Sequence, residues 1–160
     1  MKQKCLLVLT VLLLVAKLTP AQFLYEKEVK AHDFEGVTVD GRPYRLFDSP
    51  AERILLCFWS VDCDYCHEFM QLLHKNQEVI EGCELVTFAL ADSPKQVRKK
   101  MKRLRLKGWH FFDEAGWDSQ PFLDYDVNTT PTVVLIDKDK QIVGEAYDWE
   151  EFLELITENR

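Results

Sequence analysis

The segment between residues 54 and 73 constrains the fold more than any other part of this 160-residue chain. It opens with an apolar, aromatic-rich run, Ile54–Trp59, which is too short for a helix and is bounded by polar residues. Such a run is typical of a buried strand in a parallel sheet. After a short turn come two cysteines, Cys63 and Cys66, and from Tyr65 onward apolar residues recur at helical spacing. The segment therefore predicts a strand, a turn and a helix, with both cysteines where the helix begins.

The start of a helix favours reactive cysteine chemistry. Unpaired backbone N–H groups and the positive end of the helix dipole stabilise a thiolate there. Because only two residues separate Cys63 from Cys66, both lie on the first helical turn, where their sulfur atoms can meet without movement of the backbone. The simplest interpretation is a redox-active dithiol.

The first 21 residues are typical of a secretory signal peptide. Lys2 and Lys4 form a basic start, Leu6–Val15 is an apolar run, and Thr19–Ala21 is a small-residue end after which we expect cleavage. The apolar run is too short to span a bilayer as a helix, which favours a cleaved signal over a membrane anchor. The segment holds three lysines and no acidic residue, so its removal moves the formal net charge from −7 to −10. An acidic mature domain argues against nucleic acid as a partner.

The rest of the chain is predicted to form one domain. Residues 22–32 are expected to form a lead-in, and residues 33–160 a domain large enough to bury a core. Alternating apolar positions on either side of Asp40-Gly41 predict a β-hairpin. Strands are expected at 54–59, 83–89, 109–112, 131–136 and 142–146, and helices at 65–81, 94–106 and from 149 on, with a short one within 113–125. This order predicts an α/β fold with a mixed sheet.

Three helix boundaries carry local signals. Gly82 is expected to end the helix that begins at the cysteines. Ser93 predicts an N-cap followed by proline at the first helical position. Asp148, with Glu151 three residues later, predicts a capping box for the last helix.

The helix expected at 94–106 has a basic face, which is unusual in an acidic protein. The cations of this segment are Lys95, Arg98, Lys99, Lys100, Lys102, Arg103, Arg105 and Lys107. A solvated helix face is the simpler interpretation, and docking of an anionic partner is the alternative.

Two further cysteines lie within predicted strands. Cys57 falls inside the first of them and Cys83 at the start of the next. Both are interpreted as small buried hydrophobic residues. Spacing alone leaves a disulfide between them open.

Two signatures carry a family resemblance. Phe58–Cys66, FWSVDCDYC, resembles the active-site segment of thioredoxin-like proteins, and Tyr125–Asp137, YDVNTTPTVVLID, is similar to the family's second signature, in which a cis-proline begins a strand. The segments Asp33–Gly36 and Val39–Pro43 are similar to the exported TlpA/ResA-type branch. The resemblance covers residues 33–157. It implies a thioredoxin fold, with a mixed central sheet flanked by helices and an N-terminal β-hairpin extension.

The resemblance also implies an activity, that of a thiol-disulfide oxidoreductase acting on protein disulfides, with a reductase of the TlpA/ResA type favoured over an isomerase or oxidase. Cys63 would attack the substrate disulfide, and Cys66 would resolve the mixed disulfide. Pro131 would lie beside the pair, Thr130 would offer its backbone N–H and C=O to an extended substrate segment, and Tyr65 would tune access and potential. The protein would be a monomer in a bacterial periplasm, without cofactor or metal, and a membrane-bound donor would supply its electrons.

Several residues depart from the family pattern. Asp62 stands where the family often has tryptophan, and together with Asp64 it places two negative charges against a Cys63 thiolate. His67, when protonated, would act in the opposite sense. Cys57 occupies the position of the buried aspartate that accepts a proton in thioredoxins, so the usual proton relay is in question.

Other interpretations use the same residues. Cys63-x-x-Cys66-His67 matches the c-type haem attachment motif, but haem leaves the strand–CxxC–helix context and the Thr-Pro signature unexplained. A zinc site could draw on these three residues and Cys83, although no second closely spaced ligand pair exists. A peroxidase is disfavoured because Ser60, not threonine, stands three residues before Cys63. A non-enzymatic binding module on the same fold is the main alternative class.

Overall fold

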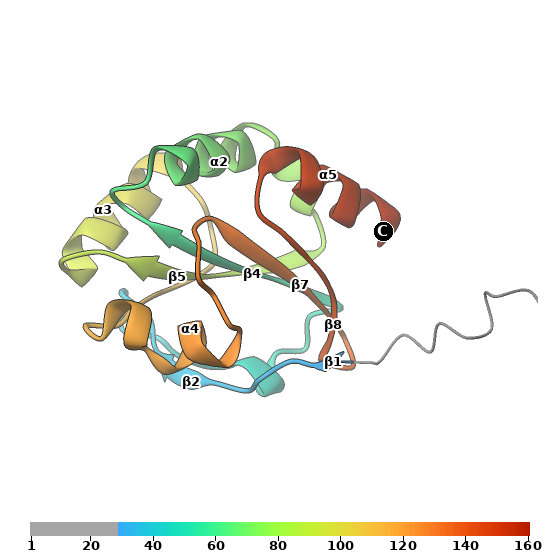
Figure 1. Cartoon of the computed structure of the whole chain (residues 1–160), viewed down its shortest axis with the longest axis horizontal. Coiled ribbons are helices and arrows are strands. Elements are labelled where there is room, and N and C mark those ends of the chain that lie inside the picture. Colours follow the sequence, from blue (N-terminus) through green and yellow to red (C-terminus); the bar gives the residue numbers. More distant parts are fainter. Residues whose placement is uncertain (1–28) are drawn as a thin grey trace, which may run out of the picture.

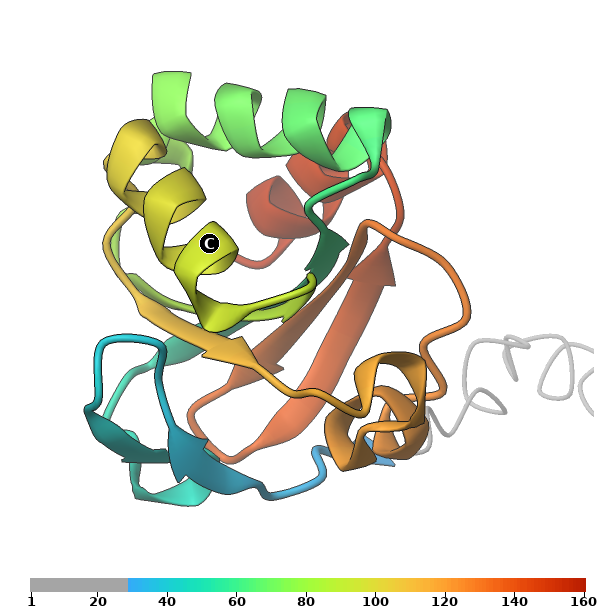
Figure 2. The same cartoon turned by 90° about the vertical axis from the view of Figure 1, so that its left-hand side faces the viewer.

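The computed structural model describes residues 29–160, which form a sheet with helices on both faces (Figures 1 and 2). The signal peptide expected at 1–21 and most of the lead-in expected at 22–32 lie outside the described residues. Within residues 29–160, no helix is both long enough and apolar enough to cross a bilayer.

The central sheet is mixed and has six strands in the order β1-β8-β7-β4-β5-β6. The strand β4 lies in the middle, where it runs parallel to β5 and antiparallel to β7. The bounds are β1 Val29–Lys30, β4 Arg53–Ser60, β5 Cys83–Leu90, β6 Trp109–Phe112, β7 Thr132–Asp137 and β8 Gln141–Ala146. The five strands predicted for the sheet from the sequence are all present, each within one residue at either end. The predicted fold class is therefore confirmed.

Helices and a hairpin cover the two faces of this sheet. The helices α2, α3 and α5 lie over one face, and α4 with the β2–β3 hairpin lies over the other (Figures 1 and 2). The bounds are α2 Asp64–Lys75, α3 Pro94–Leu104, α4 Gln120–Asp124, α5 Trp149–Glu158, β2 Glu35–Val37 and β3 Pro43–Arg45. The hairpin turns at Gly41, whose φ of 81° is the left-handed conformation that favours glycine. The predicted N-terminal hairpin extension is thus confirmed.

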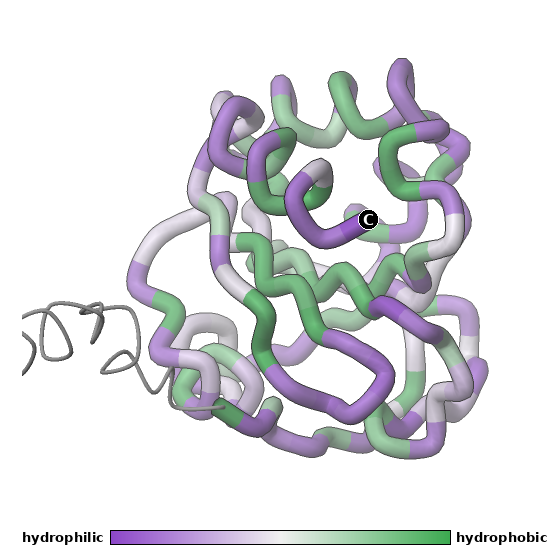
Figure 3. The backbone as a smooth tube through the Cα atoms, turned by 90° about the vertical axis from the view of Figure 1, so that its right-hand side faces the viewer, coloured by the Kyte–Doolittle hydropathy of each residue, from purple (hydrophilic) through white to green (hydrophobic). Residues whose placement is uncertain are grey.

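Both faces of β4 are buried, which explains its unbroken apolar run. Leu55, Cys57 and Trp59 belong to the core beneath α2, α3 and α5, whereas the alternate residues of the strand belong to the core on the hairpin side. All of them are fully buried. Figure 3 shows the resulting pattern, with hydrophobic stretches along the central strands and hydrophilic stretches on the outer turns.

Glu84 of β5 links the sheet to the β2–β3 hairpin and the segment that follows it. Its carboxylate accepts hydrogen bonds from Tyr44 Oη at 2.9 Å, from Ser49 Oγ at 2.6 Å and from Trp109 Nε1 at 2.9 Å. Burial, and then the Glu84 carboxylate, raises the pKa of Tyr44, so this hydroxyl stays protonated and keeps donating. Trp109 is a packing residue on this side of the sheet, because it bonds to Glu84 and also stacks beneath the Arg42 guanidinium.

The predicted end of the first helix is wrong. The helix α2 ends at Lys75, because the backbone of Asn76 leaves the helical conformation, with φ of −120° and ψ of 47°. The side-chain amide of Asn76 donates to the Leu72 carbonyl at 2.8 Å. A separate 3₁₀ turn, Gln77–Ile80, follows. Gly82, with φ of 81°, instead serves the turn that enters β5.

The two predicted N-caps differ in the structure. Asp148 Oδ1 accepts from the Glu151 N–H at 2.9 Å, as predicted, although the Glu151 carboxylate reaches back to the N–H of Tyr147 and not to that of Asp148. Ser93 occupies the cap position of α3 but makes no side-chain cap hydrogen bond.

Candidate functional site

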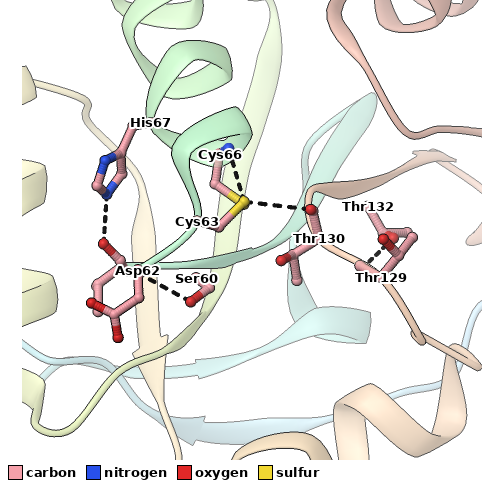
Figure 4. The surroundings of a disulfide bond; sticks show 9 residues. Ser60, Asp62, Cys63, Cys66, His67, Thr129, Thr130 and Thr132 are labelled. Atoms are coloured by element: carbon pink, nitrogen blue, oxygen red, sulfur yellow. Dashed lines mark hydrogen bonds between the residues drawn. A yellow bond between two sulfur atoms is a disulfide. The ribbon is translucent and has the colours of Figure 1, made fainter.

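Cys63 and Cys66 form a disulfide at the first turn of α2, with their Cα atoms 5.2 Å apart (Figure 4). Cys63 is the N-cap of the helix, and its Sγ accepts a hydrogen bond from the backbone N–H of Cys66 at 3.0 Å. The same N–H would stabilise a Cys63 thiolate in the reduced protein. Cys66 is fully buried, whereas Cys63 is partly exposed. The pair therefore consists of one partly exposed cysteine and one fully buried cysteine.

The loop before β7 lies against the Cys63 sulfur. The Thr130–Pro131 peptide bond is cis, and the carbonyl oxygen of Thr130 lies 3.5 Å from Cys63 Sγ (Figure 4). Thr132 holds this loop from within, because its Oγ1 donates to the Thr129 carbonyl at 2.9 Å. The sheet register explains the meeting, since Thr132 pairs with Phe58 near the end of β4. Residues nearly seventy positions apart in the chain thus form one site.

His67 lies on the side of the disulfide away from Thr130 (Figure 4). Its Nε2 is 2.5 Å from the carbonyl oxygen of Val61, and because a carbonyl only accepts, this nitrogen carries the hydrogen. The backbone N–H of His67 donates to the Cys63 carbonyl at 3.0 Å. His67 therefore ties the helix to the turn before the dithiol.

The two aspartates beside Cys63 are exposed. The backbone N–H of Asp62 bonds to Ser60 Oγ at 3.2 Å, and neither Asp62 nor Asp64 forms an ion pair with any residue from 29 to 160. Because both carboxylates face water, its high dielectric weakens their repulsion of a Cys63 thiolate relative to that of buried charges.

Cys57 lies in the buried middle of β4. Burial raises the pKa of its thiol to about 12, so Cys57 is a neutral hydrophobic side chain at physiological pH. Cys83 pairs with Arg53 at the other end of the same two strands and is only partly buried, so the prediction of a buried residue is wrong for Cys83. The thiols of Cys57 and Cys83 are both free. The disulfide between Cys57 and Cys83 that spacing left open is therefore not formed.

The strand geometry also separates the residues of the suggested zinc site. Cys83 begins β5 at the edge of the sheet opposite to the edge from which the dithiol projects, because β4 and β5 run parallel. Within the described part of the chain, no group of three or more His, Cys, Asp or Glu side chains could hold a metal ion.

Two grooves flank the dithiol on opposite faces of α2. The first, of about 480 Å³, runs between α2, the Thr129–Pro131 loop and the start of α5. The exposed ring of Tyr65 borders it, together with Glu68, Phe69, Tyr147 and Trp149. The sequence signal for this groove is the spacing of Tyr65, Glu68, Phe69 and Leu72, which places them on one helix face.

The second groove, of about 280 Å³, lies between the start of α2 and α3. Its lining residues are Val61, Asp62, His67, Gln96, Lys99, Lys100 and Arg103. Sequence reasoning noted these cations as a helix face, but it did not place them beside the dithiol. That juxtaposition depends on how α3 packs against α2.

Comparison with known families places the chain. The profile of a family described as thioredoxin-like matches residues 52–142, which include β4, the dithiol and the Thr130-Pro131 loop. The chain therefore belongs to the thioredoxin-like family. A comparison with curated proteins found no match.

Solved structures share the fold. The thioredoxin domain of a thiol-disulfide oxidoreductase from Bacteroides vulgatus has a TM-score of 0.71 at 15% identity, over 82% of this chain and 96% of that one. A thiol-disulfide oxidoreductase from Bacteroides fragilis has a TM-score of 0.69 at 19% identity, over 82% and 99%. A thiol:disulfide interchange protein from Chlorobium tepidum has a TM-score of 0.65 at 17% identity, over 82% and 96%.

Proposed function

We propose that this protein is a thiol-disulfide oxidoreductase that exchanges disulfides with protein substrates through Cys63 and Cys66. The observation that carries the proposal is the asymmetry of the pair at the start of α2. Cys63 is accessible, receives a backbone N–H on its sulfur and lies beside the Thr130 carbonyl, whereas Cys66 is buried. The bacterial fold relatives that are themselves named thiol-disulfide oxidoreductases support the same activity.

The geometry suits reduction of a substrate. The Cys63 thiolate attacks one sulfur of the substrate disulfide, that S–S bond breaks, and the released substrate thiolate takes up a proton. The Cys66 sulfur, after losing its proton, attacks Cys63 and releases the second substrate thiol. Two electrons pass to the substrate, and the protein is left with the Cys63–Cys66 disulfide.

Residues around the pair would hold the substrate. Thr130 would offer its backbone N–H and C=O to an extended segment, as an added strand beside Pro131. The groove bordered by Tyr65 would receive side chains that flank the substrate cysteine. Asp62, Asp64 and His67 would modulate the exchange from the turn and the first turn of α2.

We assign the protein to the exported TlpA/ResA-type branch, as a monomer in a bacterial periplasm whose dithiol is recharged by a membrane-bound donor. The signal-like residues 1–21 and the hairpin segment that resembles this branch support the assignment. A binding module without redox activity is the alternative, and the fold by itself suits either function.

Two substitutions test the roles of the cysteines. Cys63→Ser should reduce exchange with a disulfide-bonded protein to the uncatalysed rate, because no thiolate remains at the helix start. Cys66→Ser should accumulate mixed disulfides, which non-reducing electrophoresis and mass spectrometry detect. Cys83→Ser is the matched control and should leave the rate unchanged, since Cys83 lies at the opposite edge of the sheet. Full activity in Cys63→Ser would overturn the assignment.

A further inference from the structure

The groove between α2 and α3 carries a concentration of positive charge that the proposed chemistry does not use. We call it the basic groove and define it by the lining residues Val61, Asp62, His67, Gln96, Lys99, Lys100 and Arg103. Three full positive charges and one carboxylate therefore face a single hollow. In a chain of net charge −7, this local excess runs against the charge of the whole molecule.

Within the described part of the chain, the cations of the basic groove have no acidic partner. Among residues 29–160, the only ion pair made by α3 joins Arg98 to Asp40 at 3.4 Å, on the side of the hairpin turn. Lys99, Lys100 and Arg103 make none. Asp62, although it lines the same groove, makes no ion pair with them. An incoming anion would therefore meet cations that no carboxylate of residues 29–160 neutralises.

The spacing of these cations also favours an anion. Lys99 and Arg103 lie four positions apart on α3, and Lys100 and Arg103 lie three apart, so both pairs are like-charge neighbours that repel. Partial burial, and then the Arg103 charge, lowers the pKa of Lys100. A carboxylate bound between them would relieve the repulsion and compensate the desolvation of the lysine.

The position of the basic groove relates it to the dithiol. Val61 and Asp62 immediately precede Cys63, and His67 immediately follows Cys66. On the opposite face of α2, the groove bordered by Tyr65 is lined by the carboxylates Glu68, Asp148 and Glu150. A polypeptide lying across the exposed Cys63 sulfur would therefore meet positive charge on one side and negative charge on the other.

We propose that the basic groove binds an acidic segment of the protein whose disulfide is exchanged at Cys63. The proposal rests on the proposed function, and it narrows the substrate class to proteins with aspartate or glutamate residues beside the reactive cysteine. The flexible lysine and arginine side chains suit carboxylates that are presented by an extended segment. The groove steers such a segment toward the dithiol, so it acts on substrate capture and not on the chemical step.

The test uses the whole protein and two disulfide-containing peptides of equal length, one with glutamates beside its cysteine and one with glutamines. We expect the acidic peptide to exchange about 10-fold faster in kcat/KM at low salt. The advantage should disappear at high salt, where exposed charges are screened. It should also disappear in the triple variant Lys99→Gln, Lys100→Gln and Arg103→Gln. The matched control, Lys102→Gln with Lys107→Gln and Lys138→Gln, removes three charges outside the basic groove and should keep the preference.

The remaining outcomes separate failure of the groove proposal from failure of the proposed function. Equal rates for the two peptides, or loss of the preference in the control variant as well, would overturn the proposal while leaving the thiol-disulfide activity intact. If neither peptide exchanges, the proposed function fails, and fluorescence anisotropy with an acidic peptide that carries serine in place of cysteine becomes decisive. Binding that is lost only in the Lys99, Lys100 and Arg103 variant would then show that the basic groove binds acidic peptides and would overturn only the link to disulfide exchange, whereas no binding would overturn the groove as a site as well.

Discussion

Cys57 illustrates how burial determines the chemistry of a single side chain. It lies in the core beneath α2 together with Cys66, at the position where thioredoxins have a proton-accepting aspartate. A thiol whose pKa is raised to about 12 cannot accept a proton at neutral pH, because it already holds one. In the proposed exchange, Cys66 would therefore lose its proton by a route that does not use Cys57.

Cys57→Ala should leave the pH profile of exchange unchanged and should cost about 1 kcal/mol of stability from the lost packing. Exchange rates measured from about pH 6 to about pH 9 test the first expectation, and urea unfolding tests the second. A variant of normal stability with a shifted pH profile would show that Cys57 does take part in proton transfer.

At the scale of elements, the helix α2 is built around the dithiol. Cys63 is its N-cap, so the same sulfur that would attack a substrate also satisfies a backbone N–H at the helix start. The apolar residues Phe69, Met70 and Leu73 anchor the helix in the core. The helix thus holds Cys63 at the surface and Cys66 beneath it.

The N-caps of α5 and α3 provide a matched comparison. Asp148→Ala should lower the free energy of unfolding by about 1 kcal/mol, because it removes an acceptor for the Glu151 N–H. Ser93→Ala should have a much smaller effect, because Ser93 makes no side-chain cap hydrogen bond. Urea unfolding of both variants tests the difference. Equal losses would mean that the cap geometry described for α3 is wrong in solution.

At the scale of the whole molecule, the sequence was most informative where side-chain pattern and backbone role coincide. The apolar run Ile54–Trp59 predicted β4 because both faces of that strand are buried, and the cysteines and Thr130-Pro131 marked the two segments that meet at the site. Gly82 was misleading, because α2 ends earlier, where the backbone of Asn76 leaves the helical conformation. The two grooves could not be predicted, since each depends on the packing of helices that are distant in the sequence.

A redox titration tests directly whether Cys63 and Cys66 form a reversible couple. The protein is equilibrated with glutathione buffers of graded potential, and the fraction of the Cys63–Cys66 disulfide is read by thiol labelling and mass spectrometry. We predict a single two-electron transition, at about −270 mV for a reductase. A transition between about −180 and about −120 mV would keep the couple but assign an isomerase or oxidase role. A pair that stays in one state in every buffer would contradict the claim and favour a binding module.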